Sequence, residues 1–182
     1  MIVRALILAA LPLASAAQQA DFVSDRIATL EAGIVCSPPT IGMDSAPDTV
    51  AGATEIFEDR PDFISNGRRV PAVPGISFGV VSTSATGAID PVTFRVIHPP
   101  FTGLGVTEQS FQTRIGPATT PGATYYGFDE PYELVHGTWV MEAWDGDDLL
   151  YRVQFTVVPP AAVPDLAGLC GFEDLLSLAT GN

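Results

Sequence analysis

Residues 138–158 read TWVMEAWDGDDLLYRVQFTVV, and this stretch decides the fold. Apolar and polar side chains alternate along 138–144 and again along 149–158, which is the pattern of a strand with one buried face. The DGDD run at 145–148 consists of residues that favour turns. The sequence therefore predicts two antiparallel strands joined by a short loop.

The register of this hairpin depends on the length of its loop, because a shift of one residue exchanges the two faces of a strand. An even-numbered loop would bury Glu142 without a partner, at a cost on the order of several kcal/mol. A three-residue loop with glycine in a bulge turns Trp139 and Met141 inward instead. It also sets Glu142 opposite Arg152 on the outer face, which is a favourable cross-strand pair. We predict the three-residue loop, with a core face made of Leu149, Tyr151, Val153, Phe155 and Val157.

The same register brings three apolar residues together on the outer face of the hairpin, namely Val140, Trp144 and Leu150. An exposed apolar patch is a common mark of a surface that binds a partner. The C-terminal segment of the chain is the alternative cover for this patch. These three residues are the candidate binding site, with an unidentified protein or glycan as the expected partner.

Short apolar runs separated by glycine and proline fill the rest of the chain, which holds 17 glycines and 16 prolines among 182 residues. This punctuation is typical of all-β proteins. Asn66-Gly67 is a strong hairpin signal between two of the runs. The proline-rich stretch 37–52 has no periodicity and is expected to be a long loop. The runs that we interpret as strands are 27–36, 63–65, 68–72, 76–84, 92–98, 106–115 and 123–128.

These strands, about eight or nine with the final pair, predict an all-β chain folded as an antiparallel β-sandwich. The sandwich domain is expected to cover residues 18–160. A helical pattern appears only at 172–179. Residues 161–182 are therefore expected to form a proline-rich link and a short C-terminal helix or tail.

The first residues have the three parts of a secretory signal peptide. Arg4 precedes an uninterrupted apolar run at 5–13, and the ASA run at 14–16 is an A-x-A cleavage site. We expect residues 1–17 to be removed by cleavage after Ala16 or Ala17. The apolar run is shorter than the ~20 residues that span a bilayer, although an uncleaved anchor is the alternative. The cleaved protein is expected in the periplasm or outside the cell, without membrane insertion.

The chain carries 21 acidic residues against 8 basic ones, a formal net charge of −13, and every basic residue is arginine. This charge repels the phosphates of nucleic acids and anionic lipids, so neither is expected as a partner. The sequence has no P-loop, no dinucleotide-binding motif and no lysine to contact a phosphate. No cofactor is expected.

Cys36 and Cys170 are the only cysteines of the chain. In an exported protein, two cysteines most simply form one disulfide, which here would tie the C-terminal segment to the start of the domain. Two free thiols are the alternative. Two cysteines and two scattered histidines do not make a zinc site, and no metal site is predicted.

The run GISFG at 75–79 matches the G-x-S-x-G motif of α/β-hydrolases, with Ser77 as its serine. Asp129 and His136 even follow in the chain order of a catalytic triad. The motif requires a helix directly after the serine, whereas here the strand pattern continues through 80–84. We therefore interpret Ser77 as the outward residue of a strand.

The remaining groups with chemical potential are His98 and His136, each near the end of a predicted strand, and several acidic runs. A hydrolase would need one of the histidines beside a carboxylate. The acidic run at 145–148 lacks the spaced ligands of an EF-hand calcium loop. Adjacent pairs such as Glu58-Asp59 differ from the two separated carboxylates of a glycosidase.

Four segments resemble a bacterial family of exported proteins catalogued as domain of unknown function 3859. They are VPAVPGISFG at 70–79, HPP at 98–100, VTEQ at 106–109 and YELVHGTWVMEAW at 132–144. The resemblance covers about residues 27–159 and implies an uncharacterised exported domain, with no catalytic residue to transfer. The last segment is also similar to the final strands of immunoglobulin-like sandwiches.

We therefore expect an immunoglobulin-like β-sandwich that is not an enzyme and that binds a partner through a face or its end loops. Two other classes of function stay open. One is a hydrolase whose site is assembled from distant residues, and the other is a calcium- or carbohydrate-binding module.

Overall fold

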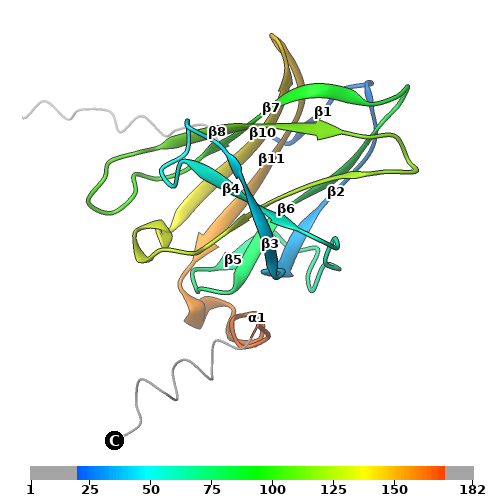
Figure 1. Cartoon of the computed structure of the whole chain (residues 1–182). Coiled ribbons are helices and arrows are strands. Elements are labelled where there is room, and N and C mark those ends of the chain that lie inside the picture. Colours follow the sequence, from blue (N-terminus) through cyan, green and yellow to red (C-terminus); the bar gives the residue numbers. More distant parts are fainter. Residues whose placement is uncertain (1–19, 171–182) are drawn as a thin grey trace, which may run out of the picture.

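The computed structural model describes residues 20–170 of the chain (Figure 1). The predicted signal peptide at 1–17 and the predicted helix at 172–179 lie outside the described residues. Within them, no helix has the length and apolar character needed to cross a bilayer. The elements are β1 (Phe22–Val23), β2 (Ile27–Cys36), β3 (Thr40–Ser45), β4 (Ala53–Phe57), β5 (Arg69–Pro71), β6 (Ile76–Ser84), β7 (Ile89–Ile97), β8 (Glu108–Ile115), β9 (Gly122–Gly127), the 3-10 turn η1 (Pro131–Glu133), β10 (Gly137–Asp145), β11 (Asp148–Val158), η2 (Pro160–Ala162) and α1 (Pro164–Ala167).

The strands form two main sheets and one separate hairpin. The larger sheet has the order β1-β11-β10-β7-β8, with the short strand β5 added parallel to β11. The smaller sheet has the order β2-β6-β9, and β3 and β4 form a two-stranded sheet of their own. The hairpin crosses in front of the main sheets in Figure 1. Apart from the parallel β5, this is the predicted immunoglobulin-like antiparallel β-sandwich.

Apolar side chains fill the space between the two main sheets. The ring of Phe78 on β6 lies 5.6 Å from that of Trp139 on β10 and 5.0 Å from that of Phe155 on β11. The indole nitrogen of Trp139 donates to the carbonyl of Val135 at 3.2 Å, so the ring is buried without an unsatisfied donor. The largest fully buried side chains are Trp139, Tyr151, Phe78, Phe94, Phe101, Phe128, Phe155, Ile34, Ile76, Ile115, Met141 and Leu150.

The β10–β11 hairpin has the predicted register along most of its length. Trp139 and Met141 are fully buried, and Glu142 pairs with Arg152. The loop, however, consists of the two residues 146–147 and not of three.

A β-bulge beside the turn makes up the difference. Ala143 pairs with Tyr151, but Trp144 pairs with Leu149, so that Leu150 is the extra residue on β11. The bulge turns Leu150 into the core, where it is 0% exposed. The prediction that Leu150 faces outward is therefore wrong, and Leu149, predicted to belong to the core face, is only half-buried.

The stretch 37–52 is not the predicted long loop, because it contains β3, which pairs with β4. Most residues of β3 are exposed on both faces. A strand exposed on both faces lacks the alternation that reveals a strand with one buried face.

Asn66-Gly67 does not join a hairpin either. Ser65 forms a bridge with Ile34 of β2, whereas Arg69 on the other side pairs in parallel with Thr156 of β11. The two flanking runs therefore pair with different sheets. Tertiary pairing overrides the local turn signal here.

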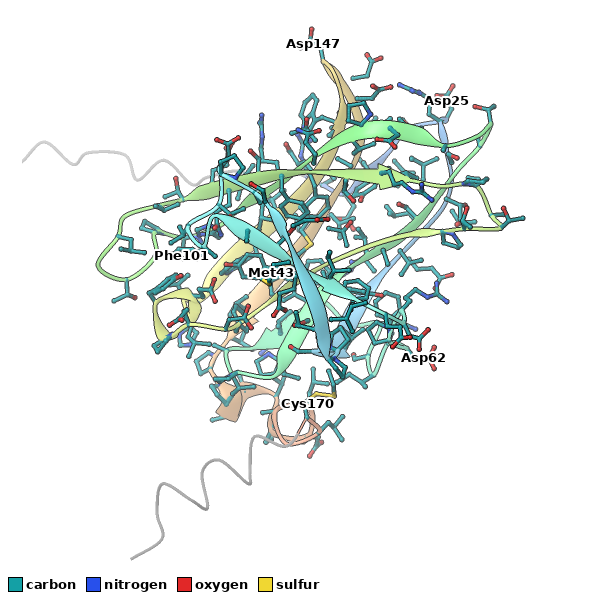
Figure 2. The ribbon with its side chains drawn as sticks, viewed as in Figure 1. Asp25, Met43, Asp62, Phe101, Asp147 and Cys170 are labelled. Atoms are coloured by element: carbon teal, nitrogen blue, oxygen red, sulfur yellow. A yellow bond between two sulfur atoms is a disulfide. The ribbon has the colours of Figure 1, made fainter. Side chains whose placement is uncertain are left out.

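Cys36 and Cys170 form a disulfide, as predicted, with their Cα atoms 5.3 Å apart. The bond joins the end of β2 to the segment after α1, at the end of the sandwich where Figure 2 labels Cys170. Disulfides persist in oxidising compartments, so this bond indicates an extracytoplasmic environment.

Candidate functional site

A cleft of about 490 Å³ lies between the β3–β4 hairpin and the open side of the sandwich. β8 is the last strand of the larger sheet and β9 is the last strand of the smaller one. The chain passes from one sheet to the other between them, and the hairpin crosses this side (Figure 1). Side chains of β3, β4 and their turn line one side of the cleft, and those of β7, β8, β9 and η1 line the other.

The hairpin is fastened to the sandwich at its turn. The backbone N–H of Val50 donates to Oε1 of Gln109 at 2.8 Å. The backbone N–H of Ser110 on β8 donates to the carbonyl of Asp48 at 3.2 Å. Ala46, in the same turn, is 2% exposed. These contacts fix the distance between the turn and the edge of the larger sheet.

The other end of the hairpin is held by an aromatic contact. The ring of Phe57, the last residue of β4, lies 5.7 Å from the ring of Tyr125 on β9. Between the two attachment points the hairpin covers the cleft without filling it. Met43 and Glu55 both line the cleft, yet Met43 is 56% exposed and Glu55 is exposed as well.

A buried polar network forms one wall of the cleft. The hydroxyl of Tyr126 donates to Oε1 of Glu133 at 2.6 Å and accepts from Nε2 of Gln109 at 3.1 Å. The second carboxylate oxygen of Glu133 accepts the backbone N–H groups of Asp129 and Glu130 at 2.8 and 2.9 Å. Burial, and then the charge of Glu133, raises the pKa of Tyr126, so its hydroxyl stays protonated and continues to donate. Glu133 is thus held in place by three donors.

Other carboxylates surround this network. Asp44 and Glu55 line the cleft from the hairpin, and Asp129 and Glu130 line it from the loop between β9 and η1. Burial raises the pKa of Asp129, and the negative charges around it, that of Glu55 first, raise it further. In the described part of the chain, no arginine or histidine lines the cleft. The charged side chains that line the cleft are therefore all acidic, an arrangement that favours a negative potential there.

His98 follows the end of β7 and its side chain is buried, with only 4% exposed. Its ring stacks against those of Phe101 and Trp139, with centroid distances of 3.9 and 4.7 Å. Nδ1 donates to the carbonyl of Pro99 at 2.8 Å, whereas the buried Nε2 has no hydrogen-bond partner. Burial lowers the pKa of His98, so the neutral ring is favoured. The described residues give this ring a packing role and no hydrogen-bonded carboxylate.

The residues of the hydrolase-like motif do not assemble into a triad. Ser77 is 3% exposed, shares a hydrogen bond of 2.7 Å with the hydroxyl of Ser37, and lies on a strand that continues to Ser84. Ser77 and Asp129 both line the cleft, but His136 is exposed and does not. The interpretation of Ser77 as a strand residue is confirmed.

Arg26 forms ion pairs with the acidic residues at the turn between β10 and β11. A guanidinium nitrogen of Arg26 lies 2.6 Å from Oδ2 of Asp145, and the other nitrogen lies 3.7 Å from Asp148. Among residues 20–170, no group of three or more histidine, cysteine, aspartate or glutamate side chains is placed to hold a metal ion.

The apolar patch predicted from Val140, Trp144 and Leu150 does not form as a single exposed surface. Leu150 is in the core, and Val140 and Trp144 are half-buried. The indole N–H of Trp144 donates to Oε2 of Glu142 at 2.9 Å, and the guanidinium of Arg95 lies 5.7 Å from its ring centroid. Trp144 thus belongs to a polar, charged row across the sheet. That Val140 and Trp144 contact a partner stays a prediction.

The cleft residues on the hairpin carry little signal in the sequence. The run ATEIF at 53–57 contains β-branched and aromatic residues that favour a strand, and the turn-rich stretch 46–52 precedes it. Together they are compatible with a hairpin. Its position over the open side of the sandwich, however, depends on contacts with β8 and β9 that lie far away in the sequence.

Comparison with known proteins gives a family and a structural neighbour. A family model described as Domain of unknown function (DUF3859) matches residues 24–157. Among solved structures, an immunoglobulin-like protein from Pseudomonas aeruginosa is 21% identical, with 78% of this chain and 99% of that chain covered and a TM-score of 0.47. No curated protein matches the sequence.

Proposed function

The chain belongs to the family described as domain of unknown function (DUF3859), and from this premise we propose that it is an exported binding protein without enzymatic activity. Its ligand site is the cleft beneath the β3–β4 hairpin. The Cys36–Cys170 disulfide and the signal-peptide pattern at residues 1–17 support export to the periplasm or the cell exterior.

The observation that carries this proposal is that the β3–β4 hairpin covers a cleft without filling it. A two-stranded hairpin alone is marginally stable in water, so it normally buries one face against the body of the protein. Here the cleft-lining residues Met43 and Glu55 remain exposed above about 490 Å³ of space. That volume is within the range of ~300–1,000 Å³ found for small-molecule sites.

The chemistry of the cleft favours binding over catalysis. Glu133 already accepts three hydrogen bonds, and the hydroxyl of Ser77 is engaged with that of Ser37. A nucleophile needs a neighbouring base, and no histidine lines the cleft among the described residues. Glu133 and Ser77 are therefore engaged in holding the wall of the site.

A fragment screen by NMR on the mature, isotope-labelled protein tests this proposal. Fragments that bind should shift the amide signals of β3, β4, β8 and β9 together. The variant Thr113→Trp, which places a large ring in the cleft, should abolish these shifts. Arg114→Trp is the matched control, because Arg114 is the next residue of β8, is exposed and does not line the cleft.

Two results would contradict the proposal. Fragments whose shifts cluster elsewhere, or that bind equally well to Thr113→Trp, would remove the cleft as the site. Hydrolysis of p-nitrophenyl acetate by the pure protein that disappears in His98→Gln, while circular dichroism shows that the variant is still folded, would support a hydrolase instead.

A further inference from the structure

The charges around the cleft restrict the kind of ligand it accepts. Every charged side chain that lines it in the described residues is acidic, and these side chains come from β3, from β4, and from η1 with the loop that leads into it. A ligand that carries a negative charge would be repelled by all of them. A ligand with a positive charge would be attracted from several sides at once.

Aromatic rings accompany these carboxylates. Phe57 and Tyr125 form a tilted pair at the hairpin end of the cleft, with an angle of 49° between their rings. Phe111, Tyr126 and Tyr132 also line the cleft. Aromatic faces attract organic cations through the ring quadrupole and also bury the apolar groups that such cations carry. Rings combined with carboxylates are therefore suited to a cation that has an apolar part.

The carboxylates are also under mutual repulsion. Asp129 has Glu55, Glu133 and Glu130 as charged neighbours, and these three raise the pKa of Asp129 in addition to the effect of its burial. A bound positive charge near Asp129 would relieve this repulsion. A cationic ligand can thus recover this electrostatic energy when it binds in the cleft.

A bare metal ion fits these features less well than an organic cation. Calcium requires six to eight oxygen ligands that converge at about 2.3–2.6 Å. The described residues offer no such group, and both oxygens of Glu133 are engaged by the protein's own donors. A space of about 490 Å³ lined by rings is also far larger than one ion needs.

We infer that the cleft binds a small organic cation, a protonated amine or quaternary ammonium group attached to an apolar body. This inference rests on the proposed function, because it takes the cleft to be the ligand site. The cation lies near Glu55 and Asp129, and its apolar body lies against the rings of Phe57 and Tyr125.

Three probes of nearly equal size test the inference: 2-phenylethylamine, 2-phenylethanol and phenylacetate. They differ in being cationic, neutral and anionic at pH 7. Each is titrated into the labelled mature protein, and the shifts of cleft amides give its dissociation constant. We expect the amine to bind at least five-fold more tightly than the alcohol, and phenylacetate not to bind.

A pair of variants with equal loss of charge separates the site from the general negative charge of the protein. Glu55→Gln combined with Asp129→Asn should weaken binding of the amine at least five-fold and leave the alcohol unchanged. Asp25→Asn combined with Asp147→Asn removes the same charge at exposed positions away from the cleft (Figure 2). This control should bind the amine as the wild type does.

The outcomes distinguish this inference from the proposed function. Equal binding of the amine and the alcohol in the cleft would overturn the preference for cations and keep the cleft as a ligand site. Cleft shifts on addition of calcium chloride, with none on addition of the amine, would replace the organic cation by a metal ion. If neither the probes nor the screened fragments shift the cleft amides, both the inference and the proposed function fail.

Discussion

Glu142 and Arg152 lie directly opposite each other on β10 and β11, with Nε of Arg152 2.6 Å from Oε1 of Glu142. The side chain of Glu142 is 4% exposed and that of Arg152 is 19% exposed. Trp144 donates to the second oxygen of Glu142 at 2.9 Å. The carboxylate is therefore buried with a hydrogen-bonded partner on each oxygen, which is the condition under which a buried charge is tolerated.

Removing that carboxylate should destabilise the protein more than removing an exposed one. Glu142→Ala leaves Arg152 without its partner, and we expect the free energy of unfolding in urea to fall by roughly 3 kcal/mol. Glu108→Ala, which breaks the exposed pair with Arg95, should cost less than about 1 kcal/mol. Equal losses of unfolding free energy in the two variants would show that the buried Glu142–Arg152 pair stabilises the fold no more than the exposed pair does.

The buried ring of His98 should make stability depend on pH. Burial lowers the pKa of His98 in the folded state below the ordinary value of 6.5, so the unfolded chain takes up a proton first as the pH falls. Stability is therefore lost as the pH falls through about 6.5 toward the folded pKa. His98→Phe keeps a ring against Phe101 and Trp139 without titrating. Unfolding between pH 7.5 and 5 should show a smaller loss in this variant, and parallel curves would refute the prediction.

The disulfide should account for a large part of the stability of the domain. It closes a separation of 134 residues, for which the chain-entropy model gives roughly 4–5 kcal/mol. Cys36→Ser combined with Cys170→Ser should therefore unfold at a much lower urea concentration. The oxidised wild type treated with dithiothreitol should behave like this double variant. A reduced protein that unfolds at the same midpoint as the oxidised one would count against the prediction.

The backbone of β9 leaves no room for a Cβ atom at Gly79 of β6. A Cβ atom built there would overlap the carbonyl oxygen of Thr124 and lie 2.7 Å from the Cα of Tyr125. Gly79→Ala should therefore push the two strands apart. We expect a lower melting temperature and a free energy of unfolding reduced by about 1–3 kcal/mol. Gly42→Ala is the matched control, because its nearest neighbour would be at an ordinary 3.6 Å. A control that melts as low as Gly79→Ala would remove the steric explanation.

Export can be checked on the mature chain. We expect mass spectrometry of protein recovered from the periplasm or the medium to show an N-terminus directly after Ala16 or Ala17. An intact chain that starts at Met1 and remains with the membrane fraction would indicate the uncleaved anchor.

The strands of the sandwich could be predicted where burial leaves a pattern. The ranges 27–36 and 76–84 match β2 and β6, because apolar runs bounded by turn residues mark buried strands. The pairing of Glu142 with Arg152 could also be predicted, because the alternative register would bury an unpaired carboxylate.

The bulge at Leu150 could not be predicted in the same way. Leu149 and Leu150 are identical neighbours, so the apolar pattern is the same whichever of them enters the core. The cleft could not be predicted because it depends on where the β3–β4 hairpin lies. Single contacts such as that between Asp48 and Ser110 place the hairpin, and they leave no periodic trace in the sequence.

The hairpin has a further consequence for the behaviour of the protein in concentrated solution. β8 is an outermost strand, and such a strand can recruit another chain into an intermolecular sheet and so start aggregation. Asp48 occupies the backbone N–H of Ser110, and the body of the hairpin lies over the same side of the molecule. The hairpin that covers the cleft therefore also takes up a backbone donor of this edge strand, which hinders intermolecular pairing at Ser110.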